Sequence, residues 1–192
     1  ILTFSYEALI NLFNAKKYDE ALHVAKQILE RQPDNHNVLQ IFAAINSAEG
    51  RHSVSIRIFQ NLVRKGKPRA QNYHNLGTEL NKVELYEEAI INFKRALVLQ
   101  VDLWSSYINL GLALGGLGHY KKAIVNYKRA ISSGAPRSIT DTNLGLALYN
   151  MKNYETAARY FQQQKDEKSQ SYLLSCLYYL NDKRKLMRLQ LY

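Results

Sequence analysis

The sequence predicts an all-α solenoid, in which antiparallel helix pairs are stacked along the chain. Three observations lead to this fold class. Among the 192 residues, a tetrapeptide ending in Asn-Leu-Gly occurs at 74–77, 108–111 and 142–145, and such a fixed interval of 34 residues is typical of stacked helical repeats. Apolar residues within each repeat are spaced as on one face of a helix, and no segment alternates with the period of a strand. Only three prolines and nine glycines are present, which favours long regular elements.

The interval divides most of the chain into five repeats, which we number in chain order: 2–35, 36–69, 70–103, 104–137 and 138–171. Repeats one and two are the least regular. In repeat two, Asn46 stands where a large apolar residue is expected, at the place that Leu80 occupies in repeat three. We therefore expect the packing between the first two repeats to depart most from the common pattern.

Repeat three shows the helix pair most clearly. Tyr73, Leu76 and Leu80 recur at helical spacing and predict a first helix. Ala89 and Phe93 begin the same pattern in a second helix, and the polar segment 81–84 between them predicts a turn. Repeats four and five have the same plan, with Gly118 predicted to cap the first helix of repeat four.

Repeat five is predicted to end the regular array, because Gln164 stands where alanine is expected. The segment 172–192 is basic and apolar, and solenoids need a terminal cap over their last exposed face. We expect this segment to form a degenerate sixth repeat or capping helices. Its apolar side also makes a homo-oligomer through the C-terminal end a prediction.

Small residues predict where helices approach closely. Gly77, Gly111 and Gly145 occupy the same place in repeats three to five, and a residue without a side chain lets two helix backbones come together. An aromatic residue follows each of them in the second helix of the repeat and is expected to fill the neighbouring gap: Phe93, Tyr127 and Phe161.

Together these features resemble the tetratricopeptide repeat, and the resemblance covers residues 2–171. It implies a right-handed superhelical solenoid whose first helices line a concave groove. It also implies a protein–protein interaction module or scaffold, which binds an extended protein or peptide segment in that groove. The positions expected to face the groove are occupied by polar and apolar residues of repeats three to five: Gln71, His74, Asn75, Thr78, Lys82, Ser105, Asn109, Leu112, Ile139, Asn143, Leu146 and Asn150.

Three of these residues form a row of one asparagine per repeat, Asn75, Asn109 and Asn143. A carboxamide offers two donors and an acceptor, so such a row suits the backbone of an extended peptide. The row is similar to the asparagine ladder in the repeat region of O-linked N-acetylglucosamine transferases. The alternative is that asparagine is only a common polar residue on an exposed helix face.

The net charge of +10, from 26 basic and 16 acidic residues, is predicted to lie outside the groove. Lys94, Arg95, Lys128 and Arg129 fall on the convex side of the second helices, and further cations lie at 64–69. This surface is either solvated or a weak docking site for an acidic partner, RNA or a membrane surface. A groove that reads nucleic acid is disfavoured because its predicted residues are almost all neutral.

The chain itself is predicted not to be an enzyme. The spacing of Gly111, Gly115 and Gly118 is like that of a glycine-rich phosphate-binding loop. However, no predicted strand precedes these glycines and no Lys-Ser/Thr follows them. The five histidines have no partner at metal-ligand spacing, and the single cysteine, Cys176, lies in an apolar segment. We therefore predict no catalytic residue, no metal and no cofactor.

The alternative function is that of a substrate-recruiting repeat region in a larger bacterial-type transferase, such as a glycosyl- or sulfotransferase. The start at Ile1 leads us to expect a longer parent protein. No apolar run is long enough for a membrane span, and we expect a cytoplasmic location.

Overall fold

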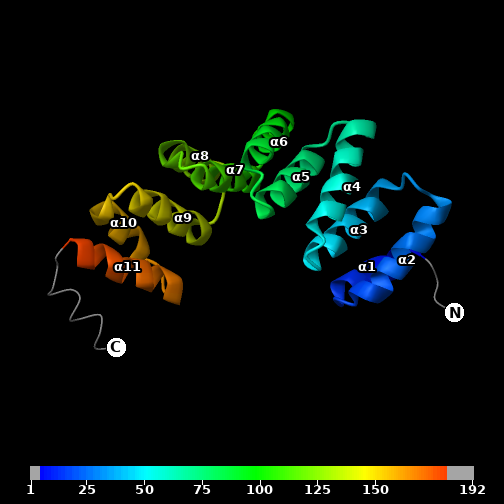
Figure 1. The fold of residues 1–192 in the computed structure, drawn as a ribbon, viewed down its shortest axis with the longest axis horizontal. Helices are drawn as coiled ribbons and strands as arrows, with labels where there is room; N and C mark the ends of the chain where they lie inside the picture. Colours follow the sequence, from blue (N-terminus) through cyan, green and yellow to red (C-terminus); the bar gives the residue numbers. More distant parts are fainter. Residues whose placement is uncertain (1–4, 181–192) are drawn as a thin grey trace. The chain divides into compact units, whose positions relative to one another are not determined.

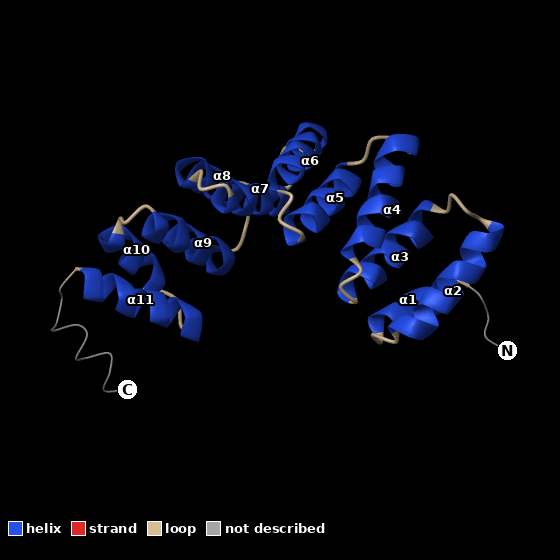
Figure 2. Ribbon diagram, in the orientation of Figure 1, coloured by secondary structure: helices blue, strands red, loops and turns tan. Residues whose placement is uncertain are grey.

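The computed structural model describes residues 5–180, and every regular element within them is an α-helix, as the sequence predicts. Eleven helices, joined by short turns, pack in consecutive pairs (Figures 1 and 2). The chain divides into two compact halves, Ile1–Leu99 and Gln100–Tyr192, which we describe separately. The boundaries of the 34-residue repeats remain predictions.

The N-terminal half contains six helices: α1 (Tyr6–Asn14), α2 (Tyr18–Arg31), α3 (His36–Ala48), α4 (His52–Lys65), α5 (Ala70–Lys82) and α6 (Tyr86–Leu99). Polar side chains cap the N-termini of α1 and α3. Ser5 Oγ accepts a hydrogen bond from the backbone N–H of Ala8 at 3.1 Å, and Asn35 Oδ1 accepts one from the backbone N–H of Val38 at 3.2 Å. Leu9 and Ile45 are fully buried in a cluster that joins α1, α2 and α3.

The C-terminal half contains α7 (Trp104–Gly116), α8 (Tyr120–Ser132), α9 (Arg137–Asn150), α10 (Tyr154–Phe161) and α11 (Glu167–Tyr179). The second helix of the last pair, α10, has only 8 residues. Asp166 then caps α11 by accepting the backbone N–H of Ser169 at 2.9 Å. This helix therefore begins five residues before the predicted start of the C-terminal segment at 172, and residues 181–192 of that segment lie outside the described residues.

The three glycines predicted to mark close helix contacts do so. A Cβ built on Gly77 would lie 2.8 Å from the ring of Phe93, and one on Gly145 would lie 2.8 Å from the ring of Phe161. At Gly111 the ring of Tyr127 is closer still. Real Cβ atoms essentially never approach a neighbour below 3.0 Å. The prediction of close contact at these three positions is therefore confirmed.

The turn inside each helix pair contains one residue in the left-handed region, and these residues recur at the same interval of 34. Gly118 has φ +76°, in agreement with its predicted role as a cap, and Gly50 has φ +75°. The other three turns place a residue with a side chain in this conformation: Lys16, Glu84 and Lys152. The backbone of the turn is thus the same in all five pairs, although glycine is present in only two.

Asn46 is buried at the position where the sequence predicts a large apolar residue, and only 4% of its surface is exposed. Its Nδ2 donates to the carbonyl oxygen of Phe42 at 2.7 Å, and its Oδ1 accepts from Nε of Arg51 at 2.8 Å. A buried carboxamide is stable when its donors and acceptor find partners, and here both ends of the amide do.

Candidate functional site

The candidate site is a pocket of about 170 Å³ in the C-terminal half. It lies between α7, α8 and α9, and four residues predicted from the sequence meet there. Leu112 of α7 is opposite three residues of α9, namely Asn143, Leu146 and Asn150. Gly115, Tyr120, Tyr127 and Ala147 complete the lining. Of these, Tyr127 was predicted as a packing residue, and neither Tyr120 nor Gly115 was among the predicted groove residues.

The pocket combines apolar walls with two free carboxamides. Leu112 is 41% exposed although it is a large apolar residue, and Leu146 is half-buried beside it. Neither Asn143 nor Asn150 has a side-chain hydrogen-bond partner among residues 5–180. Such a surface can hold an apolar side chain of a ligand while the amides bond its polar groups.

The remaining predicted residues of this half lie outside the pocket. Asn109 and Ser105 are half-buried on α7, and Ile139 is 45% exposed near the start of α9. The row of asparagines is divided between the halves, because Asn75 belongs to α5 in the N-terminal half. Of the three asparagines, the structure places only Asn143 in the pocket.

The predicted residues on α5 are already engaged in contacts within the N-terminal half. Gln71 Nε2 donates to Asn75 Oδ1 at 2.7 Å, and Thr78 Oγ1 donates to the carbonyl oxygen of His74 at 2.9 Å. The ring of His74 lies 5.8 Å from that of Phe93 on α6. Burial lowers the pKa of His74 to about 4, so the imidazole is neutral at pH 7.

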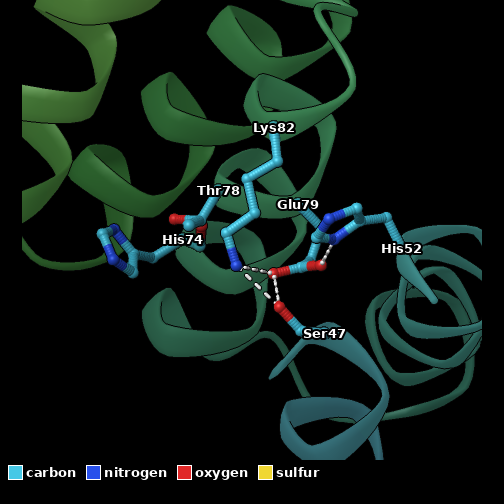
Figure 3. Close-up of polar contacts among 6 residues, drawn as sticks. All are labelled: Ser47, His52, His74, Thr78, Glu79 and Lys82. Carbon is cyan, nitrogen blue, oxygen red and sulfur yellow. Dashed lines mark hydrogen bonds and ion pairs between the residues drawn. The ribbon is translucent and has the colours of Figure 1, made fainter. Parts of the chain in front are cut away.

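Lys82 is the most strongly engaged of these residues, and its partners were not predicted (Figure 3). Its Nζ lies 2.9 Å from Oε1 of Glu79, one turn earlier on α5, and 2.6 Å from Oγ of Ser47 on α3. Ser47 Oγ donates to the same carboxylate oxygen at 2.7 Å, and Nδ1 of His52 on α4 lies 3.0 Å from Oε2. Lys82, which the sequence predicts to face the groove, is therefore a partner of Glu79.

Glu79 is the centre of this cluster and is only 4% exposed. Burial alone would raise the pKa of its carboxyl group. The hydrogen bonds from Lys82, Ser47 and His52, together with the charge of Lys82, outweigh burial and hold the pKa of Glu79 below its ordinary value. The carboxylate is thus ionised and fully bonded at neutral pH, which makes the cluster a structural link between α3, α4 and α5.

The thiol of Cys176 is protonated at neutral pH. Cys176 is fully buried in α11, and burial raises the pKa of its thiol to about 11. Within residues 5–180, no three His, Cys, Asp or Glu side chains are grouped so as to hold a metal ion.

None of the helices in the described part of the chain is both long and apolar enough to cross a membrane.

Comparison with known proteins identifies the repeat. Residues 105–133, which span all but the first residue of α7 and the whole of α8, match the tetratricopeptide repeat family. A search of curated proteins finds no match. Among solved structures the chain is similar to PilW, described as a widely conserved type IV pilus biogenesis factor, with a TM-score of 0.86 and 14% identity over 95% of this chain and 87% of that chain.

Two further structures show the same fold. Pseudomonas aeruginosa PilF has a TM-score of 0.79 and 16% identity, covering 96% of this chain and 86% of PilF. YrrB, described as a tetratricopeptide repeat protein with an unusual peptide-binding site, has a TM-score of 0.67 and 17% identity, covering 93% of this chain and 89% of YrrB. At these identities the likeness concerns the fold. Residues 105–133 thus match the tetratricopeptide repeat family, and the described chain has the fold of the solved structures, with the 34-residue interval and the glycine–aromatic contacts of its repeats.

Proposed function

We propose that this chain is a protein-interaction module that binds an extended segment of a partner protein along the first helices of its repeats. The observation that carries the proposal is the pocket in which the exposed Leu112 and the half-buried Leu146 lie beside the free carboxamides of Asn143 and Asn150. An apolar side chain of the segment would enter the pocket, and burying it would supply most of the binding free energy.

The carboxamides would hold the backbone of the segment. An extended peptide presents N–H and C=O groups along its length, and one asparagine side chain can bond one group of each kind. Asn143 has both ends of its amide free for this purpose. Asn75 lies in the N-terminal half and already accepts a hydrogen bond from Gln71, so its amide oxygen could bond a peptide only after that bond breaks.

The similarity in fold to YrrB supports the proposal, since that protein is described as having a peptide-binding site. The likeness is one of fold, and the residues that would bind a peptide here are those of this chain's own pocket. The pocket is small, about 170 Å³, so we expect it to select one aliphatic side chain of the segment.

The proposal is tested by selecting peptides from a random phage-displayed library on the full chain and measuring their affinities by fluorescence polarisation. The test variant is Leu112→Asp, which puts a charge at the mouth of the pocket. The matched control is Val125→Asp on α8, an apolar residue of similar exposure, 49% against 41%, that does not line the pocket.

We expect the selected peptides to share an aliphatic residue and to bind Leu112→Asp at least about tenfold more weakly, since burying a charge in place of an apolar contact costs more than about 1.4 kcal/mol. Val125→Asp should bind as the wild type does. Equal affinity for the wild type and Leu112→Asp would contradict the proposal, and so would a failure of the library to yield any binder.

A further inference from the structure

A second concavity lies in the N-terminal half and has a volume of about 550 Å³. It is formed by the start of α3, the end of α4 and the connection that leads to α5. Three cations line it, Lys65, Lys67 and Arg69, and we call it the basic cleft after them. It shares no residue with the pocket of the C-terminal half, so a role for the basic cleft is independent of peptide binding in that pocket.

The cations of the basic cleft are exposed and lack counterions. None of the three forms an ion pair with a carboxylate in residues 5–180. Elsewhere in the same half, Lys17, Arg51 and Lys82 each lie beside a glutamate. Asp34 is the single acidic residue among those that line the cleft. The cleft therefore carries an excess of positive charge that residues 5–180 do not neutralise.

Backbone N–H groups at the start of α3 are also directed toward the basic cleft. The helix α3 begins at His36, and the N–H groups of a first helical turn have no acceptor within the helix. Asn35 Oδ1 accepts one of them, that of Val38, and the positive end of the helix dipole remains at the cleft. The Nε2 atom of His36 is buried and has no hydrogen-bond partner among the described residues. Burial and, to a lesser degree, Arg69 lower the pKa of His36, so its ring is neutral at pH 7.

We propose that the basic cleft is a second binding site, which takes an acidic segment of a protein through the carboxylates of its Asp or Glu side chains. Lysine and arginine form charge-assisted hydrogen bonds with carboxylates, and the cleft is far larger than one carboxylate requires. Leu39, which is half-buried and also lines it, would contact the apolar parts of the segment.

A nucleic acid fits the cleft less well than an acidic peptide. Proteins that bind single strands stack the bases on aromatic side chains, and that stacking supplies a large share of the affinity. The residues that line the basic cleft include no phenylalanine, tyrosine or tryptophan. Its charges can attract a phosphate backbone, but the cleft offers the bases no platform.

The experiment uses the full chain and a fluorescein-labelled decapeptide of alternating Glu and Ser. Three further probes are the same peptide with Gln in place of Glu, the same peptide with phosphoserine in place of Glu, and a labelled single-stranded RNA decamer. The test variant is Lys65→Gln/Lys67→Gln/Arg69→Gln. The matched control is Lys121→Gln/Lys128→Gln/Arg129→Gln on α8, which removes the same charge from three exposed residues of the other half. Circular dichroism establishes that both variants are folded.

We expect the Glu peptide to bind the wild type with a dissociation constant below about 1 mM, and the cleft variant at least about tenfold more weakly. The control variant should stay within about twofold of the wild type, because long-range charge alone is screened by salt. The Gln peptide should not bind. The imidazole resonance of His36 should move on addition of the Glu peptide, whereas that of the exposed His119 should not.

The inference would be overturned if the Glu peptide did not bind at about 1 mM, or if both triple variants weakened its binding equally. It would also be overturned if the Gln peptide bound as tightly as the Glu peptide. A last contradicting result would be RNA that binds more tightly than the Glu peptide and depends on the same three cations. A phosphoserine peptide that binds more than about tenfold tighter than the Glu peptide would replace carboxylate by phosphate as the recognised group, and would overturn the carboxylate assignment.

Discussion

At the scale of single residues, two glycines of α7 have opposite roles although they stand only four positions apart. Gly111 lies against the ring of Tyr127, and any Cβ there would overlap the ring. Gly115 has no atom within 4 Å of the place where its Cβ would be. The first glycine is required by packing, whereas the second only lowers the helix propensity.

We therefore predict opposite effects of the same substitution. Gly111→Ala should lower the free energy of unfolding by about 1–3 kcal/mol, because the ring of Tyr127 must move in a packed core. Gly115→Ala should raise the free energy of unfolding by about 0.5–1 kcal/mol, the usual gain of alanine over glycine inside a helix. Urea unfolding followed by circular dichroism measures both changes. If Gly111→Ala had the same free energy of unfolding as the wild type, the close contact between α7 and α8 would not require glycine at this position.

At the scale of the helices, the first helix of each pair ends at a turn that contains one residue in the left-handed region. Lys152 adopts φ +61° between α9 and α10, in the conformation that Gly118 has between α7 and α8. A side chain in this region costs energy that glycine avoids. The turn geometry is thus imposed by the packing of the helix pair and not by the residue that occupies it.

This difference predicts a reciprocal pair of variants. Lys152→Gly should raise the free energy of unfolding by about 1 kcal/mol, and Gly118→Lys should lower it by about the same amount. A Cβ at position 118 meets no atom within 4 Å, so the expected cost is that of a side chain in the left-handed region. Thermal unfolding of the two variants and the wild type provides the comparison. Destabilisation by Lys152→Gly would mean that the lysine side chain makes a contact worth more than the strain.

How much of each helix pair was predictable depended on whether its signal was local. The interval of 34 and the glycine–aromatic pattern repeat within short windows, so the helices and their contacts followed from the sequence. Of the left-handed residues, only Gly118 was predicted; Gly50 was not singled out, and the residue types of Lys16, Glu84 and Lys152 do not indicate this conformation. The pocket was predictable in part: Leu112 and Leu146 stood out as apolar groove residues, but which of the asparagines joins them depends on packing between helix pairs.

At the scale of the whole molecule, the Glu79 cluster is the feature that sequence reasoning missed. Lys82 stood out as a single cation at a predicted groove position, and its spacing from Glu79 is the only local hint of a pair. Ser47 and His52 lie 32 and 27 residues away from Glu79 and are brought to it by the stacking of two helix pairs. Contacts of this kind depend on the fold and cannot be read from a periodic pattern.

The cluster predicts an acid-dependent loss of stability. The pKa of Glu79 is lower in the folded chain than its ordinary value of 4.5, so its contribution is present above pH 4.5 and is lost as the pH falls through the folded pKa. Glu79→Gln should lower the free energy of unfolding by about 1–3 kcal/mol at pH 7 and flatten its decline at more acidic pH. Urea unfolding between about pH 7 and pH 3 measures both effects.

The control for this prediction is Glu155→Gln on α10, whose partner Arg159 and whose own side chain are both more than 70% exposed. An exposed pair contributes little, so this variant should change the free energy of unfolding by less than about 1 kcal/mol at any pH. If Glu79→Gln and Glu155→Gln gave the same pH profile, the buried cluster would not be the acid-sensitive element of the chain.

Glu79 also limits how freely the repeats can be exchanged in engineered arrays. The equivalent positions of α7 and α9 are occupied by Ala113 and Ala147, which need no polar neighbour. A copy of 104–137 inserted after residue 69 would leave Ser47 and His52 facing alanine, and a copy of 70–103 placed elsewhere would bury Glu79 without them. The segments 36–69 and 70–103 therefore behave as a matched set, to be moved, duplicated or grafted together.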